Sequence, residues 1–487
     1  MKTKVILISF SVLVKLAMLF AFAYQTNPNL LHDFKLYNEY AGDAPDYIEP
    51  VENLLTHGSY YFGENNYAGR MPGMTVLYLP LRLLFEKHIA LNLLLIIQTI
   101  LSGVSVFFLA KLVYKRTSNI RLFYSTLFIY LFCTYVSRHD AALMTESLAA
   151  SSLIFSLYYF NKAISLDFDK KHLFFSGAFF SWCVFLRPYM LPVFGLFWLV
   201  LLYHHYKVSF KKVILLSFIF TSTFIVADIA WIIRNYKFEH KIVPLQSTLY
   251  KGYDFTGWYK SKGYFISSFG GDGLSWSPNS HAAWFSSDEY LKKYGFERPG
   301  IEIFPETLFY EDLTKDTLRK VQSYIIELSK DADLKHLDKK QRDFYESEVV
   351  RILDEFRNRY IENYPFQYYV VSPLKYLVEF TVLQSYTYYL PYTFNEASIF
   401  GKIFKIFTYS YNFLIVHVGF LSLIWLFYKR KIDSLNFIIY FTILFILIFF
   451  PILRRGSEYR MMVLAFPLFI YVINYFISTL RYKSINP

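Results

Sequence analysis

The stretch GDAPDYIEP, residues 42–50, places three carboxylates next to two prolines in a chain that is otherwise apolar and basic. The three acids are Asp43, Asp46 and Glu49. A carboxylate in such a position can cap a helix, bind an ion or accept a proton. Residue type alone leaves these roles open.

Further ionisable residues lie where apolar segments end, and they include several arginines. Arginine binds phosphate bidentately, and a carboxylate can take a proton from an attacking hydroxyl. Such a set at one membrane boundary suits a substrate with an anionic head group and a lipid tail. These residues are Asp140, Glu146, Arg187, Arg234, Arg454, Arg455, Glu458 and Arg460.

Each candidate also has a purely structural interpretation. Asp43 could be an N-cap with Asp46 as its capping-box partner, and Pro45 suits a first helical turn. Asp140 and Glu146 could cap the helix that follows them, and Arg187 could anchor a helix end at the interface. The local sequence favours neither the structural interpretation nor the functional one.

The elements that must position these residues are apolar segments. The chain has 487 residues, of which 55% are hydrophobic, and stretches of about twenty apolar residues recur with few internal charges. We therefore expect a polytopic α-helical membrane protein with about ten transmembrane helices. The predicted spans are 5–24, 89–113, 122–137, 146–163, 173–187, 189–206, 213–233, 403–428, 435–453 and 461–479.

The positions of Lys and Arg predict the orientation of these spans. With the N-terminus in the cytoplasm, every turn on that side is basic, as the positive-inside rule requires, and the C-terminus is cytoplasmic too. Because the basic residues lie in such turns, the net charge of +12 does not indicate nucleic-acid binding. The turns are Lys115–Arg121, Asp167–His172, Lys207–Lys212, Lys429–Lys431 and Arg481–Lys483.

Three domains follow from this topology. Residues 1–233 form an N-terminal transmembrane module with an outer loop at 25–88, and residues 403–487 form the C-terminal transmembrane helices. Between them, residues 234–402 are expected to be a mainly helical outer-face domain, loop-like at 247–300 and with amphipathic helices over 311–362. Lys15, inside the first span, is expected to face other helices or to snorkel.

The motifs along the chain resemble those of GT-C fold, polyprenyl-phosphate-sugar-dependent glycosyltransferases of the protein-mannosyltransferase-like kind. Their first outer loop reads G-D-x-x-x-Y, then G-x-Y, then R/K-x-P-G/P. Departures are Met71 and Gly73 in place of a double proline, and Met461 in place of an aromatic residue. The matching positions are Gly42, Asp43, Tyr47, Gly58, Tyr60, Arg70, Pro72 and Gly73, then Glu146 in TESLAA, Arg187 and Pro188 in FLRPYMLP, Trp231, Arg234 and Asn235 in WIIRNY, and Glu458, Arg460 and Pro467 in SEYRMMVLAFPLFI.

This resemblance implies an inverting sugar transfer with Asp43 as the catalytic base. Asp46, Asp140 and Glu146 would orient the acceptor or hold an optional divalent cation with Asp43; no other cofactor is implied. The implied donor is a polyprenyl-phosphate sugar, the acceptor a lipid, glycan or protein, and the location the inner (plasma) membrane with the active site on its outer face. The donor and its phosphate would be bound by Tyr47, Arg70, Arg187, Arg234, Asn235 and Arg460.

Two other classes remain open. An O-antigen-type polymerase or ligase also has many spans and a large outer loop, but it has no need of the acidic segment 25–88. A lipid-linked substrate transporter predicts ionisable residues near helix midpoints and broken helices in paired halves. Residues 247–400 have no counterpart in the resemblance, so the acceptor stays open.

Overall fold

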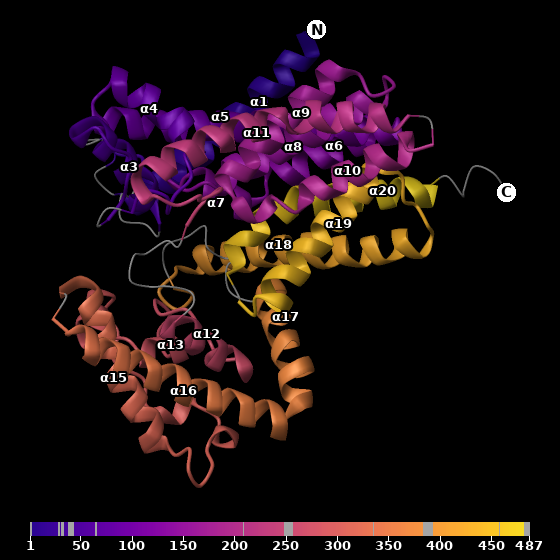
Figure 1. Cartoon of the computed structure of the whole chain (residues 1–487). Coiled ribbons are helices and arrows are strands. Elements are labelled where there is room, and N and C mark those ends of the chain that lie inside the picture. The colour runs from indigo at the N-terminus through magenta and orange to yellow at the C-terminus, as the bar shows by residue number, and fades with distance from the viewer. Residues whose placement is uncertain are drawn as a thin grey trace. The chain divides into compact units, whose positions relative to one another are not determined.

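The computed structural model is built of helices (Figure 1). It describes residues 2–27, 30, 34–37, 43–63, 66–207, 209–247, 257–334, 336–382, 393–456 and 458–481. Within these ranges β-structure is limited to an isolated bridge between Phe62 and Asn66. Gly42, the first residue of the quoted motif, and most of the predicted turn Arg481–Lys483 lie outside the described residues.

The chain divides into two compact units. The first comprises Met1–Ser247, Thr381–Ile446 and Tyr459–Pro487, and the second comprises Thr248–Phe380 and Leu447–Glu458. The second unit thus begins later than residue 234, where the outer domain was predicted to start. The reason is that α11 (Phe210–Glu239) continues past residue 234, and the segment after it hydrogen-bonds back to the first unit.

The first unit is a helical bundle (Figure 1). Within it α8 packs against α5 and α9, and α9 packs against α11. Helix α1 packs on α5, and α18 packs on α20. Its elements are α1 (Lys2–Thr26), α3 (Ala44–His57), α4 (Thr75–Leu84), α5 (Lys87–Thr117), α6 (Ile120–Leu131), α7 (Thr134–Asp140), α8 (Glu146–Ile164), α9 (Lys170–Leu186), η1 (Pro188–Met190), α10 (Val193–His205), α11 (Phe210–Glu239), α18 (Ile399–Tyr428), most of α19 (Ser434–Ile448), η7 (Tyr459–Leu464) and α20 (Ala465–Arg481).

Six helices of the described chain are long and apolar enough to cross a membrane, and a seventh is reached if α6 and α7 together form one bent span. Each of the ten predicted ranges is helical, but α8, α9 and α10 are not among the six, so the count of ten stays a prediction. Apolar helices of this kind indicate a membrane-embedded protein. The six spans are Thr3–Thr26, Lys87–Thr117, Phe210–Glu239, Ile399–Tyr428, Ser434–Leu453 and Tyr459–Leu480.

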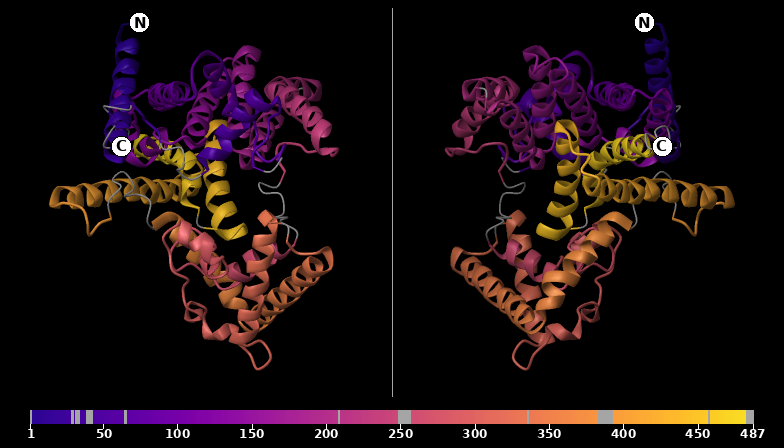
Figure 2. Two further views of the ribbon diagram at one scale, coloured as in Figure 1. Left: turned by 90° about the vertical axis from the view of Figure 1, so that its left-hand side faces the viewer. Right: turned by 90° about the vertical axis from the view of Figure 1, so that its right-hand side faces the viewer.

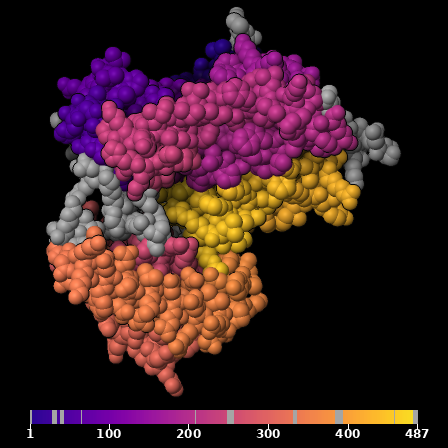
Figure 3. All heavy atoms as spheres, viewed as in Figure 1, coloured from indigo at the N-terminus to yellow at the C-terminus, as the bar shows by residue number. Residues whose placement is uncertain are grey.

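Helix α11 exposes an apolar face at the surface of the first unit. Figure 3 shows residues 210–239 as a continuous band across one face of this unit. Large apolar side chains of this helix, such as Phe218, Val226 and Ile233, are exposed. An exposed apolar helix face is unfavourable in water and suits contact with lipid.

The break between α6 and α7, where the helix axis bends by 55°, is stabilised by polar groups of α18. Tyr411 donates a hydrogen bond of 2.8 Å to the carbonyl oxygen of Ile129, and the Asn412 amide donates to Thr134 Oγ1 at 2.9 Å. Buried polar groups freed by a broken helix need such partners, because membrane interiors supply no water. The short helix α7 can therefore turn inward and carry its end toward α8.

The second unit has its own hydrophobic core. Helices α15 and α16 pack together, and α12 packs on α16 (Figures 1 and 2). The core includes Trp258, Phe265, Leu318 and Phe356. The elements are α12 (Trp258–Ser268), α13 (His281–Trp284), α14 (Asp288–Lys293), η2 (Ile301–Ile303), η3 (Glu306–Leu308), α15 (Lys315–Leu334), α16 (Lys339–Asn363), η4 (Gln367–Val371), α17 (Ser372–Val382) and η6 (Phe449–Leu453).

Two local structures were predicted for this region: loops over 247–300 and amphipathic helices over 311–362. The structure contains the helices of the second stretch, but it also contains helices in the first. The amphipathic pattern over 311–362 corresponds to α15 and α16, and α16 starts with a capping box between Asp338 and Gln341. The stretch 247–300, expected to be loop-like, contains α12, α13 and α14. These helices are short, so their apolar periodicity is too brief to be read from sequence.

Candidate active site

Asp43 occupies the N-cap position of α3, but its side chain does not cap the helix. Pro45 lies in the first turn, and Gly58 ends the helix with a left-handed φ of 69°. No side-chain capping bond comes from Asp43; its carbonyl oxygen alone accepts from the Asp46 amide, at 3.1 Å. The predicted capping box is therefore not formed, and the Asp43 carboxylate is available for other contacts.

Arg70 links the two aspartates. Its Nη2 lies 2.6 Å from Asp46 Oδ2 and 3.4 Å from Asp43 Oδ2. Nη1 donates to the Tyr47 hydroxyl at 3.2 Å, and the guanidinium lies over the Tyr47 ring, 4.6 Å from its centroid. The N-cap residue Asp43 and two residues of α3, Asp46 and Tyr47, thus hold one arginine. These contacts explain why the two ends of the first-loop motif come together.

Glu146 and Arg187 form a buried ion pair. Arg187 Nη2 contacts Glu146 Oε1, and neither side chain is more than 6% exposed. Arg187 is extended, with φ −142° and ψ 89°, because the following Pro188 disfavours helical backbone at this position. Helix α9 therefore ends at Leu186, and the arginine turns toward the first residue of α8.

Arg460 joins these two pairs into one group. Its Nη1 lies 2.9 Å from Asp43 Oδ2, and its Nε lies 3.9 Å from Glu146 Oε1. Arg460 belongs to η7, which packs against α8. We call Asp43, Asp46, Arg70, Glu146, Arg187 and Arg460 the charged cluster. Its members come from α3, the loop before α4, the start of α8, the end of α9 and η7.

The two aspartates of the cluster differ in basicity. Burial raises the pKa of the Asp43 carboxyl, but Arg460, Arg70 and Arg187 outweigh burial, so its pKa lies below the ordinary value. For Asp46, burial outweighs the attraction of Arg70, and the charge of Asp43 adds to the rise, so its pKa lies above the ordinary value. Carboxyl pairs with diverging pKa values are typical of acid–base sites.

Solvent access within the cluster is uneven. The side chains of Asp43 and Arg460 are 25% and 21% exposed, whereas that of Glu146 is fully buried. The Asp43–Arg460 pair is therefore the part of the cluster that is most open to solvent. The Glu146–Arg187 pair lies behind it as a fixed electrostatic support.

Asp140 contacts other residues. Its Oδ2 accepts hydrogen bonds from Lys15 Nζ at 2.9 Å and from Ser102 Oγ at 3.0 Å, and its Oδ1 accepts one from Ser147 Oγ. Its side chain is 2% exposed. Lys15 faces other helices, as one of its two predicted placements required. Among the described residues, the Asp140 carboxylate thus contacts Lys15, Ser102 and Ser147. None of these three belongs to the charged cluster, although Ser147 directly follows Glu146 in the sequence.

Arg234 and Asn235 also lie apart from the charged cluster in their contacts. Arg234 donates to the backbone carbonyl oxygens of Tyr60 and Tyr67, and Asn235 donates to that of Val243 at 3.1 Å. Both residues lie near the end of α11 and bind backbone carbonyl oxygens of other segments. Of the ten residues predicted for the site, seven therefore gather around Asp43.

Sequence reasoning missed His139 as a neighbour of the cluster. Its Nδ1 lies 2.9 Å from the carbonyl oxygen of Tyr135, so this nitrogen is the donor, and the buried ring interacts electrostatically with Glu146 and Arg187. A signal for it exists in the sequence, because His139 lies in the run RHDAALMTE, which ends at Glu146. The inward turn of α7, which sequence did not reveal, is what brings it near.

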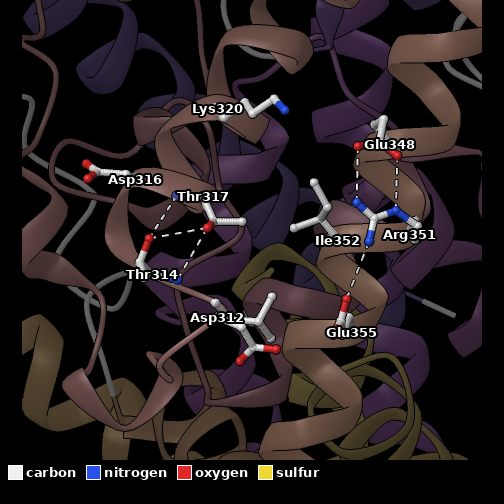
Figure 4. Close-up of a pocket in the computed structure, with 10 residues that line it drawn as sticks. Asp312, Thr314, Asp316, Thr317, Lys320, Glu348, Arg351, Ile352 and Glu355 are labelled. Atoms are coloured by element: carbon white, nitrogen blue, oxygen red, sulfur yellow. Dashed lines mark hydrogen bonds and ion pairs between the residues drawn. The ribbon is translucent and has the colours of Figure 1, made fainter.

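The second unit has a charged pocket of 520 Å³ on α15 and α16, shown in Figure 4. There Arg351 lies between Glu348 and Glu355, at 3.0 Å and 3.6 Å. The opposite charges of this pocket pair with each other on an open surface. None of the predicted site residues lines the pocket. Across the described chain, no three His, Cys, Asp or Glu side chains are grouped to hold a metal ion.

Comparison of the chain with protein-family models, curated proteins and solved structures gave no match. The function must therefore be argued from the site. The charged cluster offers an ionised, partly exposed carboxylate beside arginines. Such a set can accept a proton from a hydroxyl and stabilise a phosphate in one place.

Proposed function

We propose that the protein is an integral membrane glycosyltransferase that moves a sugar from a polyprenyl-phosphate donor to an acceptor hydroxyl. The reaction would occur on the outer face of the inner membrane, with both termini in the cytoplasm. The observation that carries this proposal is Asp43 in contact with Arg460 and Arg70 while making no capping bond to its own helix.

In the proposed step, the acceptor oxygen attacks the anomeric carbon. The acceptor's proton passes to an Asp43 oxygen, the new carbon–oxygen bond forms, and the bond to the lipid phosphate breaks with its electron pair leaving on the phosphate. The anomeric configuration inverts, and the transition state resembles an oxocarbenium ion, as in glycoside hydrolysis. Arg460, Arg70 and Arg187 offset the charge that grows on the departing phosphate.

The lowered pKa of Asp43 bears on this mechanism. An ionised carboxylate held by two arginines is a weak base, whereas an efficient base titrates near the working pH. A donor phosphate that takes Arg460 would weaken the Asp43–Arg460 pair and make Asp43 more basic. Donor binding would thus activate the base before the acceptor reacts.

A direct test is transfer of radiolabelled sugar from a panel of polyprenyl-phosphate sugars in membranes that contain the protein. The Asp43 side chain makes no capping bond, and serine could supply one. Loss of transfer by Asp43→Ser at matched abundance therefore reports on the carboxylate and not on a lost helix cap. Empty-vector membranes set the background, and Asp288→Asn, an exposed change in the second unit, is the matched carboxylate control. Normal transfer by Asp43→Ser would contradict the proposed role.

One observation favours a lipid-linked substrate transporter as a second candidate. Lys15 lies within a predicted span and pairs with Asp140, and the α6–α7 pair is broken by a bend of 55°. Transporters place ionisable groups and broken helices at their binding sites. Movement of labelled lipid-linked sugar across the bilayer of proteoliposomes, with its sugar–phosphate bond intact, would favour transport over sugar transfer.

A further inference from the structure

The guanidinium of Arg234 is enclosed by aromatic rings. It lies 4.8 Å from the ring centroid of Trp231 and 5.0 Å from that of Phe238, both on α11. Tyr60 and Tyr67, from the loop after α3, lie at 5.5 Å and 5.8 Å. Cation–π contacts with four rings are a specific environment for an arginine, and they leave little room for a phosphate.

The same guanidinium binds two backbone carbonyl oxygens of the loop. Nη2 donates to the carbonyl oxygen of Tyr60 and Nη1 to that of Tyr67. The Tyr67 amide in turn donates to Glu239 Oε1 at 3.2 Å, and the Tyr67 ring stacks on Phe238 with centroids 4.8 Å apart. The loop over residues 60–67 is therefore attached to the end of α11 at both of its ends.

A third segment, residues 243–247, is held at the same place. Asn235 donates to the Val243 carbonyl oxygen at 3.1 Å, and Asp228 Oδ1 accepts from the Leu245 amide at 3.0 Å. The Ser247 amide donates to the Ala68 carbonyl oxygen at 2.8 Å. The chain enters the second unit at Thr248. Loop, helix end and connecting segment thus meet around Arg234.

This attachment lies next to the charged cluster in sequence. Ala68 is bound by Ser247, and Arg70, two positions later, bridges Asp46 and Asp43. A loop that is fixed at residues 60, 67 and 68 has little freedom to move Arg70. Loss of the attachment would free the backbone next to Arg70, and the side-chain contacts with Asp43, Asp46 and Tyr47 would then hold Arg70 without that support.

We propose that Arg234 is a positioning residue that clasps the loop 60–68 to α11, beside the segment 243–247 that Asn235 and Asp228 hold, and so keeps Arg70 in the charged cluster. The role predicted from sequence, donor binding, would then belong to Arg70 and Arg460. The clasp itself rests on backbone and ring contacts, whereas its effect on turnover rests on the proposed function.

Arginine is required for such a clasp, because its planar fork reaches two carbonyl oxygens while its faces stack on rings. A lysine keeps the charge but supplies a single ammonium group, so Arg234→Lys is not conservative here. A site that needs only positive charge for phosphate would tolerate lysine much better. The two roles therefore give opposite expectations for one substitution.

The first experiment is hydrogen exchange of the full-length protein in nanodiscs, followed by mass spectrometry. In Arg234→Lys and Arg234→Ala we expect the amides of residues 60–70 and 243–247 to exchange at least tenfold faster. Tyr67→Leu, which removes ring contacts and leaves Arg234 in place, should show a smaller increase. Tyr236→Phe, an exposed change on the same helix, is the matched control and should exchange as the unmodified protein does. Unchanged exchange in Arg234→Ala would overturn the clasp.

The second experiment separates positioning from donor binding by sugar transfer. We expect Arg234→Lys to lower kcat at least tenfold, because Arg70 is no longer held beside Asp43 and Asp46. A rise in the donor KM should accompany this fall, because Arg70 is also a proposed donor-binding residue. A raised donor KM with unchanged kcat, or full activity with lysine, would overturn the positioning role. If the unmodified protein transfers no sugar, the proposed function fails, and the exchange experiment still decides whether the clasp exists.

Discussion

At the scale of single residues, the central feature is that Asp43 and Asp46 share Arg70 but have pKa values that are shifted in opposite directions. Asp43 also contacts Arg460, which lowers its pKa further, whereas Asp46 is in contact with Arg70 and its burial outweighs the attraction of the nearby arginines. Proximity of two like charges raises the pKa of one of them. Asp43 is therefore the group expected to receive a proton, and Asp46 the group that modulates Arg70.

The pH dependence of transfer should follow this arrangement. The folded-state pKa of Asp43 is lowered, so the carboxylate is ionised at neutral pH, and activity should be lost only as pH falls through that lowered value. In Arg70→Gln the lowering is weaker, so the acid limb of the kcat/KM profile should move to higher pH. Arg82→Gln, which removes an arginine paired with Glu52 on α3, is the control. An acid limb that stays in place would show that Arg70 does not act on the titrating group.

At the scale of elements, helix ends are brought together by close backbone contact and by buried charge. The segment before α4 meets the end of α9 at Gly73, whose carbonyl oxygen accepts from the Trp182 indole at 2.9 Å. The α7–α8 connection is held by Lys15, Ser102 and Gln98, and Gln98 donates to the carbonyl oxygens of residues 139, 140 and 142. These contacts fix the places from which Arg187 and Glu146 project.

Gly73→Ala should disturb the Arg187 corner. A Cβ at residue 73 would lie 2.5 Å from the backbone carbonyl oxygen of Phe185, so the two segments must separate. Overpacking of this kind costs about 1–3 kcal/mol, and we expect a lower melting temperature in nanodiscs together with reduced transfer. Gly195→Ala in α10, where a Cβ meets open space, should be neutral or slightly stabilising. Equal effects of the two changes would refute the close-contact explanation.

Lys15 and Asp140 should behave as a coupled pair. Lys15→Met leaves a buried carboxylate without its cation and should destabilise the protein by about 3–5 kcal/mol. The double variant Lys15→Met/Asp140→Leu removes both charges and should be more stable than Lys15→Met alone. Unfolding of the purified variants in mixed micelles measures both values. If the double variant is the least stable, the ion pair is not what the single change disrupts.

At the scale of the whole molecule, the described chain combines a bundle with apolar spans and a second unit with its own core. The topology predicted from basic turns puts the second unit on the outer face and the turn after α18 in the cytoplasm. In a protein without Cys133 and Cys183, a cysteine at Gly273 should react with an impermeant maleimide added to intact cells.

A cysteine at Lys429, in the predicted cytoplasmic turn, should react only after the membrane is permeabilised. Both positions are exposed, so access to the reagent depends on sidedness and not on burial. Labelling of position 429 in intact cells would invert the orientation. It would also remove the outer-face location from the proposed function.

The helical class and the identity of most cluster residues could be read from the sequence. Hydropathy and helical periodicity are properties of short windows, so α1, α5, α11 and α18 were predictable within a few residues. Asp43, Glu146, Arg187 and Arg460 were selected because ionisable residues gather where apolar segments end. Arg70 was selected because the resemblance implied a donor-binding role for it. This selection needs no knowledge of which residues touch.

Which charges meet was decided by tertiary structure alone. Asp43 pairs with Arg460 and Asp140 with Lys15 because helix packing brings distant segments into contact, and nothing in either local sequence encodes the partner. The same holds for Arg234: its sequence neighbours suggest a phosphate ligand, yet four rings and two carbonyl groups surround it. Ion pairs and cation–π contacts act over a few ångströms, so only the fold determines which of the candidate residues can use them.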